Sequence, residues 1–190
     1  MYLLKNYINT ITMYDYILKF NHKKISHYPR IIKIVLRFDL KKNNTFSLIS
    51  SILALELISG KKSLIFFKKN YKNINLKIKS GIPTSCVVTL RKDLMLNLLV
   101  NLFFTNIPKS FISNKITITN IRQNNICFFL TDLSVFNAIE DNYYLFKNLG
   151  NLNISLITDS NDYPSFLYLT SSIKIPVTHK ICVSSSIGRV

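Results

Sequence analysis

The sequence predicts an α+β fold in which a single, mostly antiparallel sheet has helices packed on one face and a basic opposite face. Three features lead to this prediction. Several short segments alternate apolar with polar residues, which is typical of strands that bury one face. Longer apolar segments of helical length lie between them, and lysines occupy many polar positions of the strands. The 190 residues, of which 48% are hydrophobic, suffice for one domain with a core.

The first third of the chain contains two predicted helices. Residues 1–20 have apolar side chains at three- and four-residue spacing, which indicates a helix. Residues 46–59 are apolar on most sides, so we expect a deeply buried helix there. Gly60 follows directly and is typical of the residue that ends a helix.

Between these two helices, residues 31–38 have the clearest strand pattern. The apolar positions, which should face the core, are Ile32, Ile34, Leu36 and Phe38. The opposite positions are Lys33, Val35 and Arg37. This strand therefore predicts one core face and one cationic face.

After Gly60 the pattern predicts further strands and two helices. The predicted strands are residues 63–67, 74–79, 84–90, 116–121, 126–130 and 152–158. The predicted helices are residues 94–104 and 159–170. No repeat or linker divides the chain, so we expect one domain over residues 1–177 and a tail at 178–190, with the least regular pattern in 110–150.

The charge is unevenly distributed along the chain. Residues 1–92 contain 18 Lys and Arg against 3 acids, whereas residues 93–190 contain 7 against 6, so nearly all of the net charge of +16 belongs to the first half. In residues 59–93, eight lysines and one arginine accompany a single acid. Such an excess of cations attracts nucleic acid or an anionic membrane surface. A solvated lysine surface is the alternative, and the cations on strand faces and loops favour RNA phosphates.

No pattern of catalytic, metal-ligating or cofactor-binding residues stands out. The three cysteines and three histidines lack metal-ligand spacing, and no glycine-rich phosphate loop occurs. An enzyme that modifies nucleic acids would have to use scattered acids such as Asp132, Glu140 and Asp141. The longest apolar segments fall short of the roughly 20 residues that span a bilayer. We therefore expect no catalysis, no metal, no cofactor and no membrane insertion.

Four segments are similar to motifs of a known family. They are residues 28–36 (YPRIIKIVL), 57–64 (LISGKKSL), 76–83 (LKIKSGIP) and 86–91 (CVVTLR). Together, at this spacing, they resemble ribosomal protein number five of the large subunit, with the clear likeness over about residues 28–109. Residues 110–150 depart from the family pattern, which is typical of a divergent organellar member.

The resemblance implies a structural protein of the central protuberance in a mitochondrial ribosome, or in that of a plastid-type organelle. The implied partners are 5S rRNA, large-subunit rRNA, the peptidyl-site tRNA and neighbouring ribosomal proteins, among them small-subunit protein number thirteen. The residues implied to contact 5S rRNA are Lys33, Arg37, Lys41, Asn43, Lys61, Lys62, Thr89 and Arg91. The loop implied to reach the tRNA contains Lys68, Lys69, Tyr71 and Lys72. A free organellar RNA-binding factor is the alternative function.

Overall fold

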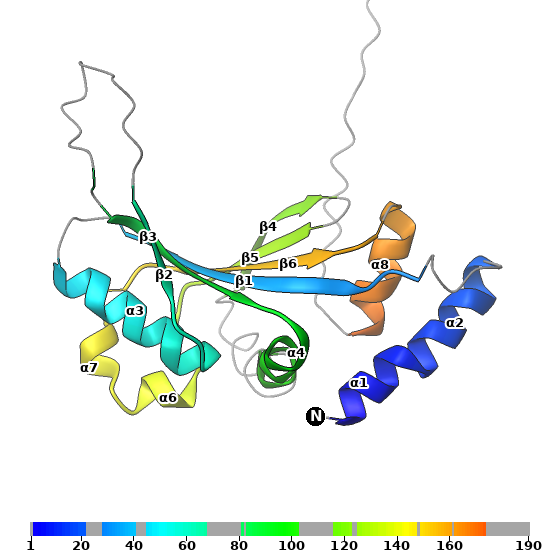
Figure 1. Ribbon diagram of the computed structural model, residues 1–190, viewed down its shortest axis with the longest axis horizontal. Coiled ribbons are helices and arrows are strands. Elements are labelled where there is room, and N and C mark those ends of the chain that lie inside the picture. Colours follow the sequence, from blue (N-terminus) through cyan, green and yellow to red (C-terminus); the bar gives the residue numbers. More distant parts are fainter. Residues whose placement is uncertain are drawn as a thin grey trace, which may run out of the picture.

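Six strands form one sheet in the order β2-β3-β1-β6-β5-β4, and every neighbouring pair is antiparallel (Figure 1). The structure is a computed structural model that describes residues 2–21, 28–40, 45–67, 81, 83–102, 116–122, 125–147, 149–160 and 162–173. The strands are β1 (Ile31–Asp39), β2 (Leu64–Phe67), β3 (Pro83–Leu90), β4 (Ile116–Arg122), β5 (Asn125–Leu130) and β6 (Leu152–Thr158). The helices are α1 (Tyr2–Asn9), α2 (Ile11–Phe20), α3 (Thr45–Ser59), α4 (Lys92–Val100), α6 (Asn137–Glu140), α7 (Tyr143–Phe146) and α8 (Tyr163–Ser172).

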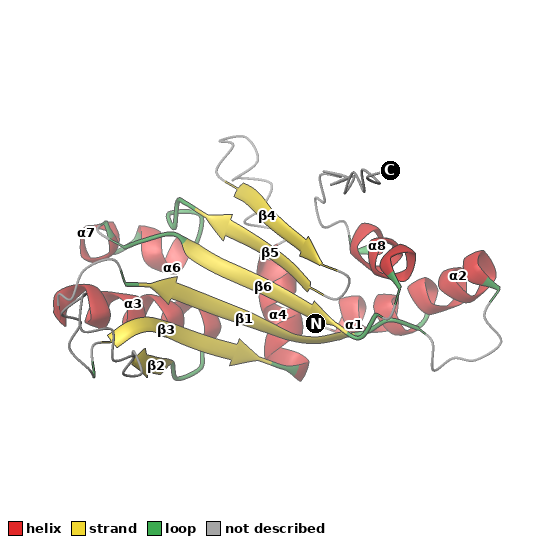
Figure 2. Ribbon diagram, turned by 90° about the horizontal axis from the view of Figure 1, so that it is seen from above, coloured by secondary structure: helices red, strands yellow, loops and turns green. Residues whose placement is uncertain are grey.

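The helices α3, α4, α6 and α7 lie on one side of the sheet, and α1, α2 and α8 lie at one end of it (Figures 1 and 2). The predicted α+β class, with one antiparallel sheet and helices on one face, is therefore confirmed. The first half of the chain supplies β1, β2 and β3, and the second half supplies β4, β5 and β6. In the described sheet the two halves meet where β1 pairs with β6.

The core lies between the sheet and the helices beneath it. Ile34, Leu36 and Phe38 of β1 are at most 1% exposed, as their alternation predicts. Ile32 was expected beside them, but it is 45% exposed. The pairing of β1 with β6 shifts register between Ile31 and Lys33, and an irregularity of one residue turns a side chain to the other face.

The predicted helix over residues 1–20 is present as two helices, α1 and α2, which are separated at Thr10. The Thr10 hydroxyl donates to the Asn6 carbonyl oxygen at 2.6 Å. Threonine side chains that bond to the preceding turn in this way often bend a helix. The prediction of one uninterrupted helix was therefore wrong at this position, although the helical content was right.

Buried hydroxyl groups attach α2 to the rest of the fold. The Tyr28 hydroxyl lies 2.6 Å from Thr12 Oγ1, and the Tyr16 hydroxyl lies 2.8 Å from Ser165 Oγ in α8. Tyr28 also donates to the Ile8 carbonyl oxygen at 3.2 Å. These bonds join the N-terminal helices both to the entrance of β1 and to the C-terminal helix.

Replacing Tyr28 with phenylalanine should lower the free energy of unfolding by about 1 kcal/mol, because the Thr12 hydroxyl loses a buried partner. Thermal unfolding of the purified chain measures this effect. Tyr14→Phe is the matched control, since Tyr14 is an exposed tyrosine on α2, the helix that contains Thr12. An equal loss in both variants would contradict the role of the Tyr28 hydroxyl.

The same tyrosine should make the fold sensitive to alkali. Burial raises the pKa of Tyr28 above its ordinary value, so the folded chain holds this phenolic proton more tightly than the unfolded chain. Stability should therefore fall as the pH rises above about 10, where the unfolded tyrosine ionises. Tyr28→Phe should show a shallower fall over that range.

The helix predicted over residues 46–59 is present as α3, but it is buried on one side only. Its buried side consists of Ser50, Ser51, Ala54, Leu55 and Ser59. Four large apolar side chains of α3 are exposed instead. The expectation of deep burial was wrong because a helix that is apolar on most sides does not reveal which side is covered.

Most of the helices and strands predicted for the second half of the chain are present in the structure. The helices α4 and α8 and the strands β4, β5 and β6 correspond to predicted elements. The short helices α6 and α7 fall in the segment with the least regular pattern and were not predicted. The predicted strand at 74–79 and the predicted tail at 178–190 lie outside the described residues. In the described part of the chain, no helix has the length and apolar character needed to cross a membrane.

Candidate nucleic-acid interface

The sheet has a face that none of the described helices covers, which we call the open face (Figure 1). Its side chains are those that alternate with the buried core positions of the strands. The register places them in rows across the sheet, with Arg37 between Val87 and Asn153. The residues of the open face are Lys33, Val35, Arg37, Asp39, Leu64, Phe66, Val87, Thr89, Asn125, Cys127, Phe129, Asn153, Ser155 and Ile157.

Lys33 and Arg37 both lie on the open face, as predicted for the polar side of β1. Arg37 Nε donates to Asp39 Oδ1 at 2.6 Å, and Asn153 Nδ2 donates to Asp39 Oδ2 at 2.9 Å. Since the side chains of Arg37 and Asp39 are about half exposed, this ion pair orients the guanidinium with little gain in stability. Arg37 keeps further N–H groups that can donate to a phosphate.

The turn after α3 places a second pair of cations at the edge of this face. Gly60 adopts φ +64°, and its N–H donates to the Glu56 carbonyl oxygen at 2.8 Å, so the chain turns sharply into Lys61 and Lys62. Lys61 Nζ then donates to the Thr89 carbonyl oxygen of β3 at 2.9 Å. Two predicted residues that are 28 positions apart in sequence are thereby brought into direct contact.

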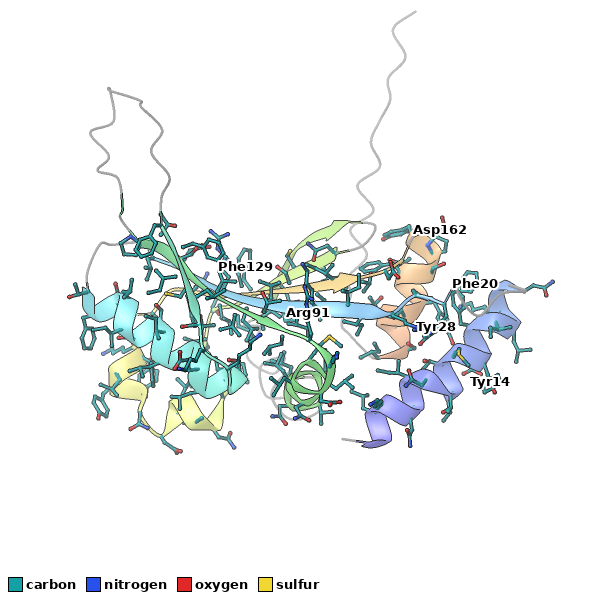
Figure 3. The ribbon with its side chains drawn as sticks, viewed as in Figure 1. Tyr14, Phe20, Tyr28, Arg91, Phe129 and Asp162 are labelled. Carbon is teal, nitrogen blue, oxygen red and sulfur yellow. The ribbon has the colours of Figure 1, made fainter. Side chains whose placement is uncertain are left out.

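Arg91 completes this group at the same end of β3 as Thr89. It follows Leu90, which pairs with Ile34, so its backbone position lies next to Lys33 at the start of α4 (Figure 3). The structure therefore gathers Lys33, Arg37, Lys61, Lys62, Thr89 and Arg91 on and beside β1 and β3. The other predicted contacts, Lys41, Asn43, Lys68, Lys69, Tyr71 and Lys72, lie outside the described residues.

The half of the open face formed by β5 and β6 is neutral. Asn153 and Ser155 follow Arg37 and Val35 across the sheet, and Cys127 Sγ lies 3.3 Å from Ser155 Oγ. Phe129 sits opposite Asn153 and adds an aromatic ring (Figure 3). The alternation of apolar and polar residues in 152–158 could have predicted that Asn153 and Ser155 share one face of their strand. The sequence offered no signal for Asp39 as the partner of Arg37.

The charge asymmetry of the sequence corresponds to the topology of the sheet. The strands β1, β2 and β3 come from the basic first half of the chain, and β4, β5 and β6 come from the nearly neutral second half. The half of the open face formed by β1 to β3 therefore offers cations to a polyanion, and the half formed by β4 to β6 offers neutral hydrogen-bonding groups. Both kinds of group are used by proteins that bind structured RNA.

The acids of the enzyme alternative do not form a comparable site. Asp132 Oδ1 accepts a hydrogen bond from the Ser134 N–H, and Glu140 and Asp141 are exposed at the end of α6. Within the described ranges, no group of three potential metal ligands comes together. Burial raises the pKa of the Cys86 thiol, and Ser51 Oγ donates to its sulfur at 3.2 Å, so Cys86 is a protonated core residue.

Comparison with known proteins finds several large ribosomal subunit proteins. No family model matches the chain. The chain is 30% identical over 181 residues to the large ribosomal subunit protein uL5m of Reclinomonas americana, which covers 93% of this chain and 98% of that protein. It is 26% identical over 187 residues to the large ribosomal subunit protein uL5 of Blochmanniella floridana, with 96% of each chain covered. The uL5 protein of Clostridium acetobutylicum is 34% identical over 94 residues, which are 48% of this chain and 51% of that protein.

Proposed function

The chain belongs to the uL5 family of large ribosomal subunit proteins, and we propose that it binds 5S rRNA through the open face and the adjoining Lys61–Lys62 turn. It is a structural constituent of the large subunit of a mitochondrial ribosome and not an enzyme.

The observation that supports this proposal most is the convergence of cations on β1 and β3. Lys33 and Arg37 lie on one strand, Lys61 is fixed against the carbonyl of Thr89, and Arg91 follows the end of β3. Among the described residues, Asp39 is the one acid that forms an ion pair in this group. Phosphates bind such a surface by neutralising its cations and releasing their own counterions.

The neutral half of the open face suits a different part of the RNA. Asn125 and Ser155, which are both partly exposed, offer an amide and a hydroxyl of the kind that bind 2′-hydroxyl groups. The aromatic ring of Phe129 can stack on an unpaired base. We propose that the RNA backbone runs along β1 and β3 while its sugars and bases face β5 and β6.

We also propose that the segment between β2 and β3 contacts the peptidyl-site tRNA through Lys68, Lys69, Tyr71 and Lys72. Both of its ends are fixed in the sheet, because Phe67 of β2 pairs with Pro83 of β3. Three lysines in five residues attract the tRNA backbone, and the tyrosine can stack on an exposed base.

Sedimentation of a mitochondrial extract tests the ribosomal function. The chain should migrate with large subunits after a moderate salt wash, and 5S rRNA should crosslink under ultraviolet light to the chain in those particles. The crosslinked peptides should come from β1, β3 or the Lys61–Lys62 turn. Recovery of the chain only in the soluble fraction would favour a free RNA-binding factor. Crosslinks that come only from the helical side of the sheet would contradict the proposed interface.

A further inference from the structure

Among the described residues of the open face, Asp39 is the one acid, and it lies directly beside the cations of β1. A negative charge at this position reduces the attraction of the face for any polyanion. The carboxylate is bonded at both oxygens, since Arg37 Nε donates to Oδ1 at 2.6 Å and Asn153 Nδ2 donates to Oδ2 at 2.9 Å. The two donors come from the paired strands β1 and β6. Asp39 would therefore only weaken RNA binding unless it serves a purpose other than attraction.

The backbone around Asp39 is fixed as well. Asp39 pairs with Ser85 of β3, and the N–H of the next residue, Leu40, donates to the Thr84 carbonyl oxygen at 2.9 Å. On the side of β6, a Cβ atom added to Gly150 would lie 3.4 Å from the Asp39 carbonyl oxygen, so the chain passes close to it there. Asp39 is thus an acceptor held at a defined place in the sheet.

The amide of Asn153 is oriented towards this acceptor. A carboxylate only accepts hydrogen bonds, so Asn153 must turn its NH₂ group to Asp39. Its Oδ1 atom is then buried and has no hydrogen-bond partner among the described residues. An unpaired buried oxygen is unfavourable. The contact with Asp39 therefore takes precedence over a partner for the amide oxygen, and β6 restrains the carboxylate from its own side.

This arrangement leaves the outer end of Arg37 available for another acceptor. In the part of the chain that the structure describes, its two terminal nitrogens have no hydrogen-bond partner, and its side chain is 52% exposed. Two parallel N–H groups of a guanidinium match two oxygens of a phosphate group. An exposed arginine ordinarily samples many rotamers, and fixing one of them in advance reduces the entropy that is lost on binding.

We propose that Asp39 and Asn153 are positioning residues, which hold the guanidinium of Arg37 in one direction for a phosphate group of a folded RNA. A phosphate whose place is set by the RNA fold can meet both terminal nitrogens, whereas the phosphates of an arbitrary RNA meet them only by chance. Asp39 thus lowers the general attraction for polyanions and favours RNA of the matching shape. The inference rests on the proposed binding of 5S rRNA, and it assigns selectivity to two residues that carry no positive charge.

Titration of the full chain with 5S rRNA and with a scrambled RNA of the same length tests this inference. Asp39→Ala should weaken binding of 5S rRNA about two- to tenfold, because Arg37 regains its rotamers. Its affinity for the scrambled RNA should stay the same or rise, since an acid has been removed. Asn153→Ala should lower the preference for 5S rRNA in the same direction but by less, because the bond between Arg37 and Asp39 remains.

Two controls separate positioning from charge and from folding. In an Arg37→Ala background, Asp39→Ala should no longer change the preference for 5S rRNA, since the side chain that it positions is absent. Asp93→Ala is the matched control for charge, because Asp93 is also an exposed acid in an ion pair, with its Oδ1 3.8 Å from Lys5 Nζ. This variant should leave the preference unchanged.

The opposite results overturn the inference. Tighter or unchanged binding of 5S rRNA by Asp39→Ala would show that Asp39 does not position Arg37. An equal loss of affinity for both RNAs would indicate a general change in the fold, and a loss of preference that persists in the Arg37→Ala background would exclude the arginine as the cause. A native chain that does not prefer 5S rRNA would instead contradict the proposed function, so the two failures are distinguishable.

Discussion

Replacing Phe38 with alanine should lower the free energy of unfolding by about 3–5 kcal/mol, which is a large part of the stability of a domain of this size. Phe38 is 1% exposed on β1, which pairs with β3 on one side and with β6 on the other. Truncating its ring would open a cavity where both halves of the sheet meet, and the paired strands cannot move together to fill it. Chemical denaturation of the purified chain measures the loss.

Phe66→Ala is the matched control for this prediction. Phe66 lies on the edge strand β2 and is 52% exposed, so the same truncation removes little buried surface. We expect it to cost less than about 1 kcal/mol. Similar losses in the two variants would show that the centre of the sheet does not determine the stability of the fold.

Replacing both Lys61 and Lys62 with alanine should weaken 5S rRNA binding by about tenfold or more at physiological salt, if each lysine neutralises one phosphate. The dependence of log K on log salt should also become shallower, by about 0.7–0.9 for each lost contact. Lys61 is held in place by its hydrogen bond to the Thr89 carbonyl oxygen, and both lysines are exposed. Titration of the full chain with 5S rRNA at several salt concentrations measures both quantities.

A control with the same loss of charge separates a local contact from a general attraction. Lys5→Ala plus Lys147→Ala also removes two exposed lysines, but Lys5 lies on α1 at one end of the sheet, and Lys147 lies just after α7 on the helical side. This variant should keep most of its affinity and its salt dependence. If the two double variants behave alike, the Lys61–Lys62 turn is not a specific part of the interface.

The alternation of apolar residues predicted the sheet well, because each strand buries one face. Ile34, Leu36 and Phe38 are buried as expected. The pattern failed at Ile32, where the register shift between β1 and β6 turns one residue outward. That shift depends on the pairing with a strand more than a hundred residues away, which the local sequence cannot specify.

The candidate site was only partly visible in the sequence for a similar reason. The shared face of Lys33 and Arg37 follows from their spacing alone. The contact of Lys61 with the carbonyl of Thr89 follows from the packing of α3 against β3. The position of Asn153 beside Asp39 follows from the pairing of β1 with β6. These contacts join residues that are far apart in the sequence, so residue type and local spacing do not predict them.

The division of the sheet into two halves also has a consequence for the order in which the protein folds during its synthesis. By the time residue 100 has been translated, β1, β2, β3, α3 and α4 are all available, together with the basic residues of the proposed interface. The outer edge of β1 must then wait until residue 158 for its partner β6. An unpaired central strand is prone to associate with other chains. The basic half of the nascent protein therefore benefits from its own positive charge, which keeps neighbouring copies apart until the C-terminal half closes the sheet.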